Sequence, residues 1–135
     1  MSQGNVELVR QAFEGAGVRG LRETAETCWH AEVEYVEDPG WPGASSYQGR
    51  DAVLRCFWNY LNALGREQDL SIEVERVVDA GMRQVPFVRV RSVSSSEVPH
   101  DHLWGYVVEV KDGRVIYSRA YYEPAETLEA VGLRE

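Results

Sequence analysis

The segment His100–Glu123, HDHLWGYVVEVKDGRVIYSRAYYE, decides how this chain folds and where its function is to be sought. It reads as one β-hairpin with its turn at Asp112 and Gly113. Both residue types tolerate the positive φ angles that a two-residue hairpin turn requires. The segment therefore predicts two long antiparallel strands joined by a tight turn.

Side chains alternate between the two faces of a strand, so the turn also fixes which residues share a face. On one face the predicted pairs are His102 with Glu123, Trp104 with Tyr121, Tyr106 with Arg119, and Val108 with Tyr117. The other face is small and apolar and carries Leu103, Gly105, Val107, Ser118, Ala120 and Tyr122. A β-bulge would shift the pairing by one residue and exchange the faces. Because a purely structural sheet rarely collects so many aromatic and ionisable groups, we expect the first face to line a binding cavity.

Composition is that of an ordinary soluble globular chain. The 135 residues suit a single domain over residues 1–135, with 44% apolar and 27% charged residues. The net charge of −8 argues against nucleic acid and anionic membranes as partners, because both need clustered Lys and Arg. No apolar run approaches the roughly 20 residues of a membrane span.

Compartment is inferred from the termini and the cysteines. The N-terminal segment lacks the apolar core of a signal peptide. Cys28 and Cys56 fall in predicted helices without CxxC spacing, which favours two buried, reduced thiols. We therefore expect a cytoplasmic protein.

Hydrophobic periodicity predicts helices first and strands later. Helical spacing predicts an N-terminal helix with Asn5 as its N-cap and a second, short helix after Gly20. It also predicts a third helix over 50–64 and a short last helix that starts at Pro124. Period-two segments are 32–37, 70–79, 84–94, 99–111 and 114–122, with turns at 80–82 and 94–97. This order predicts an α+β fold in which a curved antiparallel sheet wraps around three helices as a cone.

Several segments resemble a SnoaL-like member of the nuclear-transport-factor-two-like (NTF2-like) superfamily. They are the N-terminal helix pair, 33–39, 47–53, 112–115, 121–128 and 130–133. The resemblance implies a cone-shaped fold with a pocket inside it, often dimeric through the outer sheet face. It also implies a family of polyketide cyclases, isomerases, dehydratases and epoxide hydrolases that share no universal catalytic motif. Glu123 departs from the pattern, since many relatives have Asp there.

His102 and Glu123 are the first catalytic candidates. A carboxylate beside an imidazole orients the ring and raises its basicity, as a general base requires. Two other interpretations fit equally: an ion pair at the strand ends, or Glu123 as the N-cap of the last helix. The sequence does not separate them.

Arg119 and Asp38 are the other catalytic candidates. Arg119 beside Tyr106 could bind a carboxylate or enolate, or could simply stack on that ring. Asp38 could be an acid or base with a raised pKa in an apolar mouth, or an ordinary turn residue before Pro39. His100, His102 and Glu123 could form a facial triad, but both histidines lie at the start of a strand, where fraying disfavours a metal site. No motif implies a cofactor.

Aromatic residues supply the predicted substrate-binding wall. They are Tyr35, Trp41, Trp58, Trp104, Tyr106 and Tyr121. We expect a closed pocket on the order of 300 Å³ or more for a small apolar or aromatic molecule. Core packing alone is the competing explanation for Trp58.

These observations favour a cofactor-independent acid/base enzyme of cyclase, isomerase or dehydratase type acting on a largely apolar substrate. Two alternatives remain open: a non-catalytic ligand-binding protein, and a dimeric interaction module. A homodimer through the outer sheet face is expected, because soluble proteins rarely expose a broad apolar patch such as Leu103, Gly105, Val107 and Ala120 to water.

Overall fold

A computed structural model of the chain describes residues 2–18, 20–64, 70–92 and 100–133. Its helices are α1 (Ser2–Val18), α2 (Leu21–Cys28), α3 (Arg50–Leu64) and α4 (Pro124–Ala130). Its strands are β1 (Trp29–Val36), β2 (Ser46–Gln48), β3 (Leu70–Asp79), β4 (Arg83–Ser92), β5 (His100–Lys111) and β6 (Arg114–Tyr121). The turn expected at 94–97 lies outside the described residues. The first helix begins before Asn5, so Asn5 is not its N-cap.

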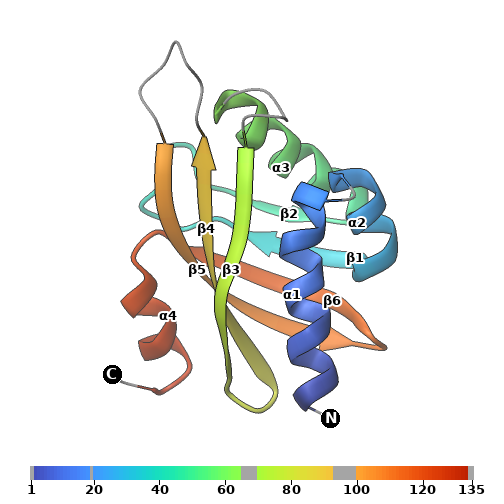
Figure 1. Cartoon of the computed structure of the whole chain (residues 1–135), viewed down its shortest axis with the longest axis vertical. Coiled ribbons are helices and arrows are strands. Elements are labelled where there is room, and N and C mark those ends of the chain that lie inside the picture. The colour runs from blue at the N-terminus through green and yellow to red at the C-terminus, as the bar shows by residue number, and fades with distance from the viewer. Residues whose placement is uncertain (1, 19, 65–69, 93–99, 134–135) are drawn as a thin grey trace.

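The strands form one curved sheet in the order β2-β1-β6-β5-β4-β3. All neighbours are antiparallel except β1 and β6, which run parallel, so the sheet is mixed where an antiparallel one was expected. Figure 1 shows β3 and β4 running nearly across the direction of β1. This bending gives the sheet its concave face and confirms the predicted α+β cone.

Three helices cover the concave face. Val9 of α1, Ala25 of α2 and Val53 of α3 belong to the same buried cluster as residues of the sheet. Apolar residues at helical spacing produce this, because each helix can bury one stripe against the strands. The main core therefore lies inside the cone.

The hairpin turn forms where the sequence predicts it. Asp112 and Gly113 have φ angles of 54° and 74°, and Lys111 pairs with Arg114. Positive φ at both central residues is the signature of a type I′ turn, whose twist suits a hairpin.

A β-bulge follows within β6. Val110 pairs with Val115, but the next pair is Glu109 with Tyr117, so Ile116 has no partner in β5. One extra residue shifts every later pair by one position.

The predicted register of the site is therefore wrong. Gly105, not Trp104, lies opposite Tyr121, and Ala120, not Arg119, lies opposite Tyr106. The β5 residues lie on their predicted faces of the sheet. The β6 residues after the bulge lie on the face opposite to the predicted one. Ser118 and Ala120 consequently point into the cone, and Arg119 points away from it.

Helix α4 packs on the convex face of the sheet. Leu128 of α4 clusters with Val85, Phe87 and Leu103, and Figure 1 shows the helix beside β5. Gly105 lets the helix approach closely, since a Cβ there would lie 2.6 Å from Cγ2 of Thr127. Part of the apolar patch expected at a dimer interface is thus covered by the chain itself, and Ala120 is on the other face.

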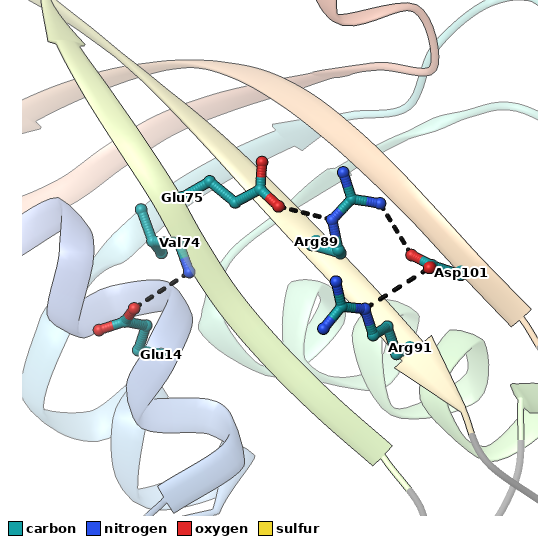
Figure 2. Close-up of polar contacts among 6 residues, drawn as sticks. All are labelled: Glu14, Val74, Glu75, Arg89, Arg91 and Asp101. Atoms are coloured by element: carbon teal, nitrogen blue, oxygen red, sulfur yellow. Dashed lines mark hydrogen bonds and ion pairs between the residues drawn. The ribbon is translucent and has the colours of Figure 1, made fainter.

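Polar side chains complete the β3 edge. Arg10 of α1 donates to the carbonyl of Val74 at 3.0 Å. Glu14 of α1 accepts from the N–H of Val74 at 3.0 Å (Figure 2). These bonds satisfy backbone groups that an edge strand leaves open. Helix α1 therefore protects this edge as well as filling the core.

Arg89 and Arg91 of β4 belong to an ion-pair network on the convex face. Arg89 contacts Glu75 at 2.6 Å and Asp101 at 2.8 Å, and Arg91 contacts Asp101 at 3.5 Å (Figure 2). Neither arginine therefore contributes to the interior of the cone.

Candidate functional site

A cavity of about 60 Å³ lies inside the cone, between the helices and the sheet. Apolar side chains make up most of its wall, and its hydroxyl groups belong to Tyr35, Tyr60, Tyr106 and Ser118. No charged side chain lines this cavity among the described residues. It is much smaller than the pocket of roughly 300 Å³ that the sequence led us to expect.

A second hollow of about 20 Å³ continues toward the mouth of the cone. It brings in the polar groups of Glu37, Asp38 and Cys56. Four side chains line both hollows and so form the partition between them: Tyr35, Phe57, Tyr60 and Tyr106. A rotation of these side chains would join the two spaces.

Glu37 is the carboxylate at the polar end of this interior. Its Oε1 accepts hydrogen bonds from the N–H of Ser45 at 3.0 Å and the hydroxyl of Tyr47 at 3.4 Å. Its Oε2 accepts a hydrogen bond from the Cys56 thiol at 3.7 Å. Three hydrogen-bond donors therefore hold this one carboxylate in place.

The phenols of the interior are held in their neutral form. Burial raises the pKa of Tyr35 and that of Tyr106 well above the ordinary value. Burial also raises the pKa of Tyr60 to about 12, against the lowering effect of its hydrogen bond with Trp104. These hydroxyls can therefore donate hydrogen bonds at neutral pH but do not act as bases there.

The thiol of Cys56 is also neutral at physiological pH. Burial, and then the charge of Glu37, raises its pKa to about 12. A neutral thiol is a weak nucleophile. Neither cysteine forms a disulfide within the described residues, and Cys28 is buried whereas Cys56 is half-buried.

The strand register explains the room beside Glu37. Tyr35 of β1 pairs with Ser118 of β6, and Ala120 pairs with Tyr106 of β5. Ala120 lines the same hollow as Glu37 and Tyr106, and its single methyl group leaves space between them. The bulge at Ile116 is therefore what brings a small residue to this position.

An aromatic cluster surrounds the mouth. The indole N–H of Trp104 donates to the hydroxyl of Tyr60 at 2.9 Å, and the ring of Trp104 makes edge contacts with Trp41 and Tyr122. His102 stacks on Tyr122 with ring centroids 3.8 Å apart. Four of the predicted wall residues, Tyr35, Trp41, Trp104 and Tyr106, thus line the two hollows.

Asp38 fastens the loop after β1 to the end of β6. Its Oδ1 accepts from the N–H of Gly40 at 2.9 Å, and its Oδ2 accepts from the N–H of Tyr122 at 2.8 Å. Both carboxylate oxygens are thus engaged by backbone groups, which matches the turn interpretation of this residue.

His102 and Glu123 are not cross-strand partners. Nε2 of His102 lies 2.8 Å from the carbonyl oxygen of Tyr122, so this nitrogen carries the donated proton. Glu123 lies beyond β6, at the N-cap position of α4, where its side chain makes no capping hydrogen bond. The N-cap position is the alternative left open by the sequence.

Three other predicted site residues lie away from the cavity. Arg119 and Tyr121 are on the convex face, with the guanidinium 5.0 Å from the ring centroid. Trp58 is 55% exposed and borders a surface groove beside α3 with Arg22 and Arg55. Arg119 therefore does not meet Tyr106, and Trp58 does not line the cone.

Glu37 is the polar residue that the sequence-based interpretation overlooked. Its signal was present, because Glu37 has the same strand parity as Val33 and Tyr35. A carboxylate on the inward face of a strand is costly unless partners satisfy it, and it therefore marks a candidate site.

Within the described residues no group of three His, Cys, Asp or Glu side chains could hold a metal ion. No helix in this part of the chain is long and apolar enough to cross a membrane.

No protein-family model matches the sequence, and no curated protein is significantly similar to it. Solved structures, in contrast, match nearly the whole chain. An NTF2-like protein of unknown function from Burkholderia pseudomallei K96243 has a TM-score of 0.71 at 15% identity, covering 96% of this chain and 98% of that one. TerC co-crystallised with polyporic acid has a TM-score of 0.73 at 16% identity, covering 95% and 98%.

A protein described as a SnoaL-like polyketide cyclase, from Jannaschia sp. CCS1, has a TM-score of 0.68 at 20% identity, covering 98% of this chain and 94% of that one. At these identities the likeness concerns the fold. This chain has the cone-shaped α+β fold of the NTF2-like superfamily, as its resemblance to SnoaL-like proteins predicts.

Proposed function

We propose that this protein binds a small, largely apolar organic molecule inside the cone and acts on it by acid/base chemistry, without a resident cofactor. The observation that carries the proposal is the position of Glu37. Its ionisable group borders the same hollow as the neutral phenols of Tyr35, Tyr60 and Tyr106. TerC, which shares the fold, was co-crystallised with polyporic acid, and this supports small-molecule binding.

In this proposal Glu37 is the general base. A carboxylate removes a proton from the carbon beside a carbonyl group, and the electron pair moves onto the carbonyl oxygen. Tyr60 and Tyr106 donate hydrogen bonds to that oxygen as its negative charge develops. The proton then returns from Glu37 to another atom of the substrate, which gives an isomerase or cyclase-type reaction.

Ligand size sets a condition on this mechanism. An engineered apolar cavity of about 150 Å³ is enough to hold benzene, whereas the larger hollow here measures about 60 Å³. Substrates larger than a few heavy atoms therefore require the partition to move. Displacement of Tyr60 would break its 2.9 Å hydrogen bond with the indole N–H of Trp104.

Proton exchange provides the test. Small cyclic ketones in D₂O should exchange their α-protons faster with the protein than in buffer, as measured by proton NMR. Glu37→Gln should lower the catalysed rate by roughly 10²-fold or more, because it removes the base but keeps the shape. Glu34→Gln is the matched control, since Glu34 pairs with Gln48 and Tyr117 and has the opposite strand parity.

His102 is the second acid/base candidate. Its Nε2 is bound to the Tyr122 carbonyl, so Nδ1 is the ring nitrogen that would exchange a proton with a substrate. His102→Gln in the same assay distinguishes the two. A loss of exchange in this variant, with Glu37→Gln unaffected, would transfer the role of base to His102.

A non-catalytic ligand-binding protein is the alternative function. It has the same cavity but would show ketone binding without accelerated exchange. If a ketone binds but its protons exchange at the same rate with and without the protein, the protein is a non-catalytic binder.

A further inference from the structure

The hydroxyl of Ser118 is a buried polar group that the proposed proton transfer does not use. The residue is 6% exposed and lines the larger hollow of the cone. Its Oγ has no hydrogen-bond partner among the described residues. An unpaired hydroxyl in an apolar environment opposes folding, so its presence calls for an explanation.

The other buried serine and threonine hydroxyls of the described chain all have partners. Ser92 donates to the carbonyl of Leu64 at 2.8 Å, and Thr24 donates to the carbonyl of Gly20 at 2.9 Å. Thr127 donates to the carbonyl of Pro124. Ser118 is therefore the exception among the buried serine and threonine hydroxyls of the described residues.

The position of Ser118 points to a ligand and not to a neighbouring element. The residue pairs with Tyr35 of β1 on one side and Val108 of β5 on the other, and both are buried. Its inward strand parity directs the side chain at the cavity. Glu37 borders only the smaller hollow nearer the mouth, so the cone has two separate polar points.

We propose that Ser118 determines substrate specificity by forming a hydrogen bond with one polar atom of the bound molecule. Because no charged side chain among the described residues lines the larger hollow, the ligand is neutral where it meets Ser118. Its class is a small ketone, alcohol or ether with an apolar skeleton. This inference rests on the proposed binding of a small molecule in the cone but not on the role of Glu37.

Paired probes test the inference. Cyclopentanone and cyclopentane have similar shapes, and only the ketone can accept a hydrogen bond. Titrations followed by the methyl resonances of Val88 and Val90, which line the cavity, give both dissociation constants. The wild-type protein should prefer the ketone, and Ser118→Ala should reduce that preference by roughly 5–10-fold.

Stability provides an independent readout, with Ser92→Ala as the matched control. Without ligand, Ser118→Ala should melt at the wild-type temperature or about 2–4 °C above it, because it removes an unpaired hydroxyl. Ser92→Ala should melt below the wild type, because it removes a hydrogen bond of 2.8 Å, and should keep the ketone preference. A lower melting temperature for Ser118→Ala would mean that the hydroxyl has a partner in the protein, and would overturn the inference.

The remaining outcomes separate this inference from the proposed function. If Ser118→Ala binds both probes with the wild-type preference, Ser118 forms no hydrogen bond with the ligand. The proposed binding inside the cone would still hold. If the wild-type protein binds neither probe, both the proposed binding and the inference are refuted.

Discussion

The thiol of Cys56 donates a hydrogen bond to Oε2 of Glu37 across 3.7 Å, and this contact joins the middle of α3 to the residue that follows β1. The pair lies where the loop after β1 closes over the cone, since Ser45 also donates to the same carboxylate. A substitution of Glu37 should therefore change the reactivity of the Cys56 thiol. This reactivity can be measured without knowing the substrate.

The first prediction concerns that reactivity. Cys56 should react slowly with iodoacetamide at neutral pH, because its pKa is raised to about 12 and the thiolate is scarce. Glu37→Gln removes one cause of the raised pKa and should accelerate alkylation. Mass spectrometry of the alkylated peptides separates Cys56 from Cys28. An unchanged rate would mean that burial alone controls the thiol.

The second prediction concerns the partition of the cavity. Tyr60→Phe removes the acceptor of the Trp104 indole N–H and leaves that donor buried. The free energy of unfolding should fall by about 1–3 kcal/mol, as measured by urea denaturation. Tyr122→Phe is the control, because the contacts of Tyr122 are through its backbone and its ring. Equal stabilities for Tyr60→Phe and the wild type would show that the indole finds another partner.

The third prediction is a loss of stability at alkaline pH. Cys56 and Tyr60 keep their protons up to about pH 12 in the folded chain, above their ordinary values of 9.0 and 10.0. Between those limits the unfolded chain binds fewer protons than the folded one, so the free energy of unfolding falls as pH rises. The urea midpoint should decrease above about pH 9, and the decrease should be smaller in Tyr60→Phe. A flat profile would contradict the raised pKa values.

Local sequence signals predicted most of the elements. The third helix was expected over 50–64 and the first long strand over 70–79, and both have those bounds. Apolar residues repeat every 3.6 residues in the helix and every two residues in the strand. At the turn, Asp112 and Gly113 are residue types that tolerate positive φ angles. The parallel pairing of β1 with β6 has no such local signal, because it joins segments far apart in the chain.

The site was predicted less well because its register depends on one residue. A glycine at the bulge would have signalled it, but the residue without a partner is Ile116, which is ordinary in a strand. The hairpin residues of β5 were therefore placed on the correct face and Arg119 was not. Glu37 could have been found from its parity with Tyr35, whereas the size of the cavity depends on packing between distant elements.

The fourth prediction is the homodimer. Helix α4 covers Leu103 and Gly105, so a partner would have to use the part of the convex face that carries Tyr117, Arg119 and Tyr121. Sedimentation equilibrium at micromolar concentration should give twice the chain mass of 15.3 kDa. Tyr121→Glu should return the monomer mass, since it places a charge in the interface. A wild-type protein that sediments as a monomer would exclude this dimer.

The fifth prediction concerns the contact between α4 and the sheet. Gly105→Ala would place a methyl group 2.6 Å from Cγ2 and 2.9 Å from Oγ1 of Thr127, with the Pro124 backbone 3.3 Å away. The helix must move, and the free energy of unfolding should fall by about 1–3 kcal/mol. Thr127→Ala removes the two closest atoms, so the double variant should be more stable than the sum of the single effects predicts. Additive effects in urea denaturation would show that the close approach of Thr127 is not what makes glycine necessary at position 105.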